Sequence, residues 1–331
     1  MALSAIGWGL LGSGLAAQLQ RRLLGSQDVL PADFPPVVHV YVASAGQRRL
    51  CLGALADPQA VLTTAQCMLD GAGGVSASLE TQVVVGSSES VPGTEGQYVG
   101  TDRYLIHPNY TTNGLNHNLA VVYLTDPAPM STNVSTVAIY NRYMDANTTT
   151  LVVGAGQSEA NAKQPPTRLQ AAPFTVAPAN QCAAAQTSSY NNGPTFCAET
   201  PGAPNVCTGD SSSPAFVQED GRWYVAGLVG AKHAEDDSAS CDASAATVFF
   251  TRLAYYLPWL TADAGLTRND LAHGTGGEPA DPPPGIDPNA DEILPDQSAS
   301  SAPLTVPLIP PLTLAALYGM VLGTLGCALG P

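Results

Sequence analysis

Short apolar runs separated by turn residues dominate the chain between residues 37 and 260. The runs are rich in Val, Leu, Tyr and Phe and are bounded by Gly, Pro and Asn, which is typical of antiparallel strands. Strands are predicted over residues 37–44, 60–66, 81–87, 118–124, 151–156, 223–229 and 247–253. Apolar residues at helical spacing predict a helix over Arg252–Leu260. Taken alone, this pattern predicts an all-β sandwich or barrel.

Composition adds three points to this picture. A chain of 331 residues with 45% hydrophobic and only 12% charged content can bury one sizeable two-part core and still carry tails. The net charge of −15, with only 12 Lys and Arg, argues against nucleic acid as a partner, because phosphate binding needs clustered basic residues. The five histidines are scattered, so we expect neither a metal site nor a cofactor.

Both ends of the chain differ from the strand-rich middle. Residues 1–17 form an apolar stretch that ends in small residues, which predicts a secretory signal peptide. Arg21 and Arg22 follow, so residues 18–22 are interpreted as a short propeptide that is cleaved after Arg22; the alternative is a chance basic pair. Residues 263–303 are predicted to form an acidic, Pro/Gly-rich stalk, because residues 274–303 contain too few apolar groups to fold.

Residues 304–331 contain no charged side chain and are long enough to span a bilayer. A glycolipid-anchor signal is favoured, because small residues at 298–302, a spacer at 303–311 and an apolar tail at 312–329 match its layout. On that hypothesis Cys327 is discarded with the tail. A transmembrane helix is the alternative, although no basic residue follows it.

Three segments carry the candidate chemistry: TTAQC (63–67), NHNLAVV (116–122) and CTGDSSSP (207–214). Together they resemble the trypsin/chymotrypsin family over residues 23–262. That family has T-A-A-H-C around its histidine, D-I-A-L at its aspartate after an H-P-x-Y stretch, and C-x-G-D-S-G-G-P around its serine. Here His107-Pro108-Asn109-Tyr110 precedes the second segment.

The resemblance implies a catalytic triad in which only the serine is retained. Ser211 matches the nucleophile, Gln66 stands where the family has histidine, and Asn118 stands where it has aspartate. A serine hydroxyl needs an imidazole to take its proton, and an amide cannot do this near neutral pH. His117 is an unsuitable substitute, because neighbouring side chains on a strand face opposite sides and it adjoins Asn118.

The resemblance also implies a fold and a set of supporting residues. The fold is two packed six-stranded antiparallel barrels with a C-terminal helix. Six cysteines allow fifteen connectivities, and the family's pairing is Cys51–Cys67, Cys182–Cys197 and Cys207–Cys241. Such bridges belong in an oxidising compartment.

Further roles follow from the same resemblance. The backbone N–H groups of Gly209 and Ser211 match the oxyanion hole, and a new amine at Leu23 would pair with Asp210. The specificity pocket maps to Asn205 at its base, to the strand Gly230–Lys232, and to Val248, where a β-branched side chain would narrow it.

The sequence therefore predicts a secreted, surface-anchored serine protease homologue without effective peptidase activity, which binds a protein ligand at the former substrate cleft. The alternative is a serine endopeptidase with weak or non-standard catalysis through Ser211, and a decayed copy without a role is a third hypothesis. Sequons at Asn109, Asn133 and Asn147 predict glycosylation.

Overall fold

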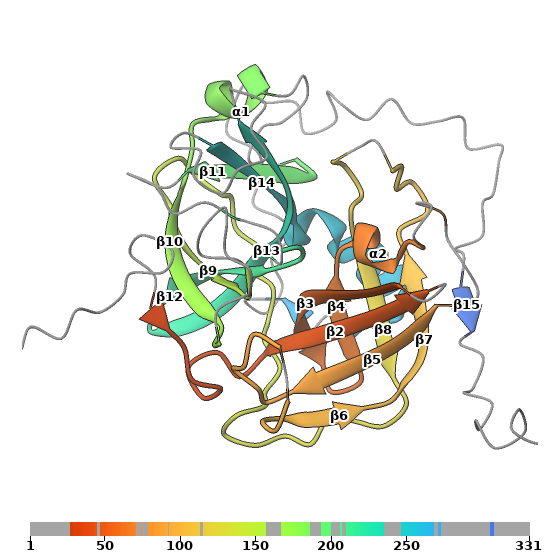
Figure 1. The fold of residues 1–331 in the computed structure, drawn as a ribbon. Coiled ribbons are helices and arrows are strands. Elements are labelled where there is room, and N and C mark those ends of the chain that lie inside the picture. The colour runs from red at the N-terminus through yellow and green to blue at the C-terminus, as the bar shows by residue number, and fades with distance from the viewer. Residues whose placement is uncertain are drawn as a thin grey trace, which may run out of the picture.

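The computed structural model (Figure 1) describes residues 27–44, 47–70, 74, 79–91, 93–112, 115–156, 167–185, 193–199, 206, 210–234, 246–267, 271–272 and 305–307. For residues 47, 183–185, 232–234, 246 and 305–307 only the backbone is described. Within these ranges the strands form two antiparallel sheets, which sit side by side as barrels (Figure 1). The predicted all-β fold with two packed barrels is thereby confirmed.

The first barrel is built from the N-terminal strands. They are β2 (Val37–Ser44), β3 (Gln47–Asp57), β4 (Ala60–Thr63), β5 (Glu80–Val85), β6 (Gln97–Val99), β7 (Thr101–Ile106) and β8 (Ala120–Leu124). Only Gly100 separates β6, which pairs with β5, from β7, which pairs with β8. This stretch therefore joins the two ends of the sheet and closes the barrel. Val38, Val40 and Val42 alternate along β2 and fill its interior.

The second barrel follows the same plan. Its strands are β9 (Thr149–Gly154), β10 (Gln170–Val176), β11 (Thr195–Glu199), β12 (Pro214–Glu219), β13 (Arg222–Ala234) and β14 (Ala246–Arg252). Pairing between β9 and β10 closes the ring. Phe174, Phe196 and Phe250 occupy the interior, and the rings of Phe196 and Phe250 stack at 4.8 Å.

Within the described ranges, short strands and helices add to both barrels. Strand β1 (Gln27–Asp28) pairs with β10, and strand β15 (Thr305–Pro307) pairs with β7. The helix α1 (Ala179–Ala185) precedes β11. The predicted terminal helix is present as a 3-10 turn, η2 (Leu253–Tyr256), that continues into α2 (Leu257–Ala262).

The apolar interface between the barrels is the part of the core that positions the candidate site. Leu52 and Leu119 from the first barrel meet Phe216 and Leu228 from the second in one buried cluster. Leu253, Leu257 and Leu260 of η2 and α2 join this cluster. Each such side chain stabilises the fold by roughly 1.5–3 kcal/mol through burial. Gln66, Asn118 and Ser211, the three predicted triad positions, lie in turns at the edge of this interface.

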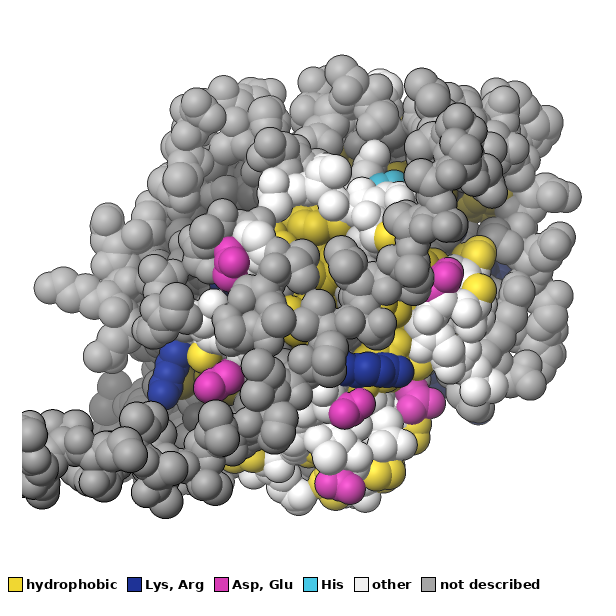
Figure 2. Space-filling model, turned by 90° about the vertical axis from the view of Figure 1, so that its right-hand side faces the viewer, with side chains coloured by type: hydrophobic (Ala, Val, Ile, Leu, Met, Phe, Trp, Pro, Cys, Tyr) yellow, Lys and Arg dark blue, Asp and Glu magenta, His cyan; other side chains and the backbone are white. Residues whose placement is uncertain are grey.

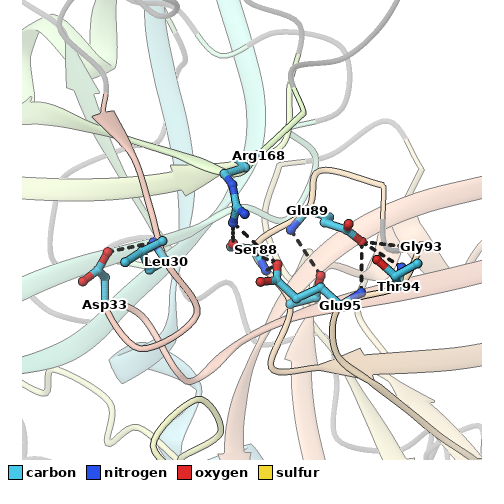
Figure 3. Close-up of polar contacts among 9 residues, drawn as sticks. Leu30, Asp33, Ser88, Glu89, Gly93, Thr94, Glu95 and Arg168 are labelled. Atoms are coloured by element: carbon cyan, nitrogen blue, oxygen red, sulfur yellow. Dashed lines mark hydrogen bonds and ion pairs between the residues drawn. The ribbon is translucent and has the colours of Figure 1, made fainter.

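A polar network also ties the barrels together (Figure 3). Oε2 of Glu89 accepts hydrogen bonds from the N–H groups of Gly93 and Thr94 at 2.7 and 3.2 Å, and these backbone donors lower the pKa of Glu89. In the same loop, Glu95 accepts a hydrogen bond from the Ser88 N–H at 2.8 Å. Arg168, from the second barrel, donates to Ser88 Oγ at 2.6 Å. Through Ser88 and Glu95, this loop of the first barrel is therefore joined to the second barrel.

Candidate functional site

Gln66 and Asn118, the residues predicted at the two replaced triad positions, lie next to each other. The strand predicted over residues 60–66 ends earlier, since β4 stops at Thr63. Gln66 lies in the following 3-10 turn, η1 (Ala65–Met68). The backbone N–H of Gln66 donates a hydrogen bond to Oδ1 of Asn118 at 3.0 Å. Asn118 is buried, with 1% of its surface exposed. The structure therefore brings these two positions together, as the resemblance implies.

Neighbouring groups fix both of these residues. Nη1 of Arg49 donates to the Gln66 carbonyl at 2.7 Å, and Oγ1 of Thr251 donates to the Asn118 carbonyl at 3.0 Å. The disulfide Cys51–Cys67 joins η1 to β3. Sequence reasoning did not identify Arg49 or Thr251 as supports, since a backbone carbonyl partner leaves no motif in the sequence.

The serine loop crosses from the second barrel to the first. Ser211, which is half-buried, accepts a hydrogen bond at its carbonyl from the Leu52 N–H at 3.2 Å. The next residue, Ser212, has a φ of 64°, in the left-handed region that favours glycine. Its Oγ lies 2.5 Å from Oγ1 of Thr64 and accepts from the Thr64 N–H at 3.2 Å. Because Thr64 lies two residues before Gln66, this contact places Ser211 and Gln66 at the same junction.

Asp210 lies buried behind the serine. Its Oδ1 accepts a hydrogen bond from the Gly156 N–H at 2.7 Å, and 3% of its surface is exposed. The carboxylate also lies so close to the Cα atoms of Gly154 and Gly156 that a Cβ at either position would overlap it. The two glycines are therefore required by this carboxylate, a constraint that the sequence alone did not indicate.

The histidines of the described ranges are engaged elsewhere. The rings of His107 and His117 stack at 4.7 Å, and both meet Tyr256 edge-on. Burial lowers the pKa of His107 to about 3, and burial also lowers that of His117. His117 adopts a φ of 60° in the turn before β8, not on a strand as the sequence prediction assumed.

His39 is the third residue of β2 and is fully buried. Neither of its ring nitrogens makes a hydrogen bond to another described residue. Burial lowers the pKa of His39 to about 4, and the nearby Glu89 opposes this shift only in part. The side chain of His233 and the whole of His273 lie outside the described residues.

The positions predicted to form the specificity pocket are described in part. Lys232 pairs with Val248 between β13 and β14. Val248 is fully buried and shares one apolar cluster with Val206 and Phe250. A Cβ at Gly230 would lie 3.4 Å from Nδ2 of Asn118, so Gly230 borders the triad site as well as the predicted pocket strand.

Several predicted residues lie outside the described ranges. They are Leu23, Asn205, Cys207, Gly209 and Cys241. The activation pair, the pocket base, one half of the oxyanion hole and the Cys207–Cys241 bridge therefore stay predictions. The other two bridges, Cys51–Cys67 and Cys182–Cys197, are present, and such bridges fit an extracellular protein.

On the face in Figure 2, acidic side chains are scattered among polar and apolar ones. Within the described residues, no group of three His, Cys, Asp or Glu side chains could hold a metal ion. No helix in that part of the chain is long and apolar enough to cross a membrane.

Comparison with known proteins identifies the family. The Trypsin family model matches residues 24–260. Brachyurin of Leptuca pugilator is 25% identical over 247 residues, which cover 74% of this chain and 100% of that protein. Chymotrypsin-C of Bos taurus is 25% identical over 249 residues, covering 73% and 88% of the two chains. Chymotrypsin-like elastase family member 1 of Bos taurus is 24% identical over 250 residues, covering 72% and 88%. The chain belongs to the trypsin family, with the chymotrypsin-like fold of these serine proteases.

Proposed function

We propose that this protein is a serine protease homologue without effective peptidase activity, and that it acts by binding another protein at the former substrate cleft. The contact between Gln66 and Asn118 carries the proposal. It supports the assignment of both residues to triad positions, and both side chains are amides. Neither can take a proton from Ser211 and return it to a leaving amine near neutral pH.

The expected loss of rate is large. In related triads, loss of the base costs about 10⁶ in rate, which is roughly 8 kcal/mol of barrier. The second replacement should add little, because triad members act as a unit. The N–H groups of Gly209 and Ser211 would leave at most weak turnover from an oxyanion hole. Binding, in contrast, needs only the shape and polarity of the cleft.

The proposal places the protein outside the cell. The two disulfides support export, and so does the signal peptide predicted for residues 1–17. Asn109, Asn133 and Asn147 are exposed, as glycosylation would require. Attachment to the cell surface would come from residues 304–331.

Processing after Arg22 would give a new amine at Leu23, which we propose to pair with Asp210. Strand register supports this pairing, because Asp28 pairs with Gln170, and Gln170 pairs with Gly154 beside the Asp210 carboxylate. Two strand spacings are about 10 Å, and five residues can reach roughly 16 Å.

A fluorophosphonate probe tests the absence of an activated serine. The purified protein should show no labelling above that of Ser211→Ala under conditions that fully label an active trypsin-family protease. Rapid labelling that disappears in Ser211→Ala would favour the alternative, a peptidase with an unidentified base.

Affinity capture with a matched pair of variants tests the binding role. Ser211→Trp places a large side chain in the former cleft, whereas Met130→Ala changes an exposed residue in the connection between β8 and β9. A protein ligand of the cleft should be captured by the wild type and by Met130→Ala, and lost from Ser211→Trp. Equal capture by all three would place binding elsewhere and reject this part of the proposal.

A further inference from the structure

The described segment nearest the end of the chain is part of a folded sheet. Thr305, Val306 and Pro307 form β15, which pairs antiparallel with Leu105, Tyr104 and Arg103 of β7. Figure 1 shows β15 beside β7, at the outer edge of the first barrel. The segment follows a long run of residues outside the described ranges, so this pairing fixes a distant part of the chain onto the barrel.

The edge of β7 is suited to accept an extra strand. On its other side β7 pairs with β8 along its length, from Thr101 to Ile106. An edge strand presents backbone N–H and C=O groups of alternate residues, and an added strand satisfies them. β15 covers three residues of this edge.

The sequence of the added strand fits this position. Thr305 and Val306 are β-branched and favour extended backbone. Pro307 has no N–H to donate, so it is tolerated at the border of a sheet and ends the ladder there. Pro303 lies just before the strand, and the two prolines therefore limit the addition to a short strand.

This pairing bears on the two membrane hypotheses. A glycolipid-anchor signal would be cut near residues 298–302, and Thr305–Pro307 would leave with the discarded tail. A tail that stays on the mature chain keeps β15 in the barrel. We infer that the C-terminal tail is retained on the mature protein and is fastened to the first barrel by strand addition at the edge of β7.

The direction of β15 sets where the tail continues. Because β15 is antiparallel to β7, the chain arrives beside Leu105 and leaves beside Arg103. Ile106 pairs with Ala120, close to Asn118, whereas Arg103 pairs with Tyr123, farther along β8. The rest of the uncharged tail, from Leu308 onward, therefore starts from the end of β7 that is farther from the predicted triad positions. If the tail attaches the protein to a membrane, as proposed above, this exit point would direct the former substrate cleft away from the membrane.

The first test identifies the mature C-terminus. Mass spectrometry of the protein released from expressing cells by detergent should find peptides that extend through Thr305 and Val306. A mature chain that ends at or before residue 302 with a glycolipid overturns the inference, while the proposed loss of catalysis and the surface attachment would stand.

The second test measures the pairing itself. Hydrogen exchange of the segment 103–106 is compared in the full-length chain in detergent, in a chain that ends at residue 302, and in Val306→Pro. Val306→Ala is the matched control, because it keeps the backbone N–H. We expect exchange in the truncated chain and in Val306→Pro to be at least about tenfold faster than in the full-length chain and Val306→Ala. Equal exchange in all four would overturn the inference.

Discussion

The hydroxyl of Ser212 lies 2.5 Å from that of Thr64, across the interface between the two barrels. Ser212 replaces the first glycine of the family's G-D-S-G-G-P motif and keeps a backbone φ of 64°. The serine therefore combines a strained backbone with a buried polar contact. This contact links the segment that carries Ser211 to the segment that carries Gln66.

Substitution of Ser212 should separate these two effects. Ser212→Ala keeps the strain and leaves the Thr64 N–H unpaired, so it should destabilise the fold by about 1–3 kcal/mol. Ser212→Gly loses the same hydrogen bonds but relieves a left-handed conformation, which costs a non-glycine residue roughly 1 kcal/mol. Urea unfolding should therefore rank wild type above Ser212→Gly and Ser212→Gly above Ser212→Ala. A Ser212→Ala variant as stable as the wild type would show that the contact with Thr64 contributes nothing.

Introducing histidine at position 66 and then aspartate at position 118 should restore catalysis in two steps. Gln66→His alone supplies a base without its orienting carboxylate, whose absence costs about 10⁴ in rate in related triads. Gln66→His with Asn118→Asp should therefore hydrolyse a peptide ester far faster than the single variant, and the single Asn118→Asp variant should stay inactive. Turnover by Asn118→Asp alone would mean that Gln66 is not the reason for inactivity.

Buried histidine should make the fold less stable in acid. The pKa of His39 is lowered from 6.5 to about 4 in the folded state, so the unfolded chain binds a proton first as pH falls. This contribution to the free energy of unfolding is fully present above pH 6.5. It is lost as the pH falls towards 4, which lowers the free energy of unfolding by roughly 3 kcal/mol in total. In His39→Leu, denaturant titrations between pH 7 and 4 should show a smaller decrease. An unchanged pH profile would contradict this origin of acid sensitivity.

The close approach of Gly156 to Asp210 predicts a sharp steric effect. Gly156→Ala would place a methyl group against the buried carboxylate and should destabilise the fold by about 1–3 kcal/mol. Gly93→Ala is the matched control, because its Cβ would meet only the end of the Glu89 side chain at 3.5 Å. Thermal unfolding should show a lower midpoint for Gly156→Ala alone. Equal midpoints for the two variants would indicate that Asp210 moves aside without cost.

Some elements could be predicted because the local pattern and the tertiary contacts agree. The bounds of β2 were predicted as observed, since its alternate valines fill the first barrel. β3 was missed because it begins with Gln47-Arg48-Arg49, which follows no strand pattern. β10 was not predicted either, and it contains Pro173. The proline is tolerated because β10 pairs with β9 alone at this residue, so the missing N–H of Pro173 leaves no second strand without a partner.

The candidate site could be predicted only where a motif marks it. Short segments identified Gln66, Asn118 and Ser211, and the structure places them at one junction. The supporting contacts of Arg49, Thr64 and Thr251 depend on the packing of the barrels, so the sequence could not indicate them. β15 was not predicted either, because its partner β7 lies about 200 residues earlier in the chain and strand pairing at that separation leaves no local signal.

The most direct test of the proton-transfer argument is hydrolysis of a peptide ester by the purified, processed protein, with Ser211→Ala as the paired control. With an amide at position 66, both proteins should hydrolyse the ester at the same rate, close to that of buffer alone. Rapid hydrolysis by the wild type that is abolished in Ser211→Ala would contradict the account, because it would require a base that accepts the proton of Ser211.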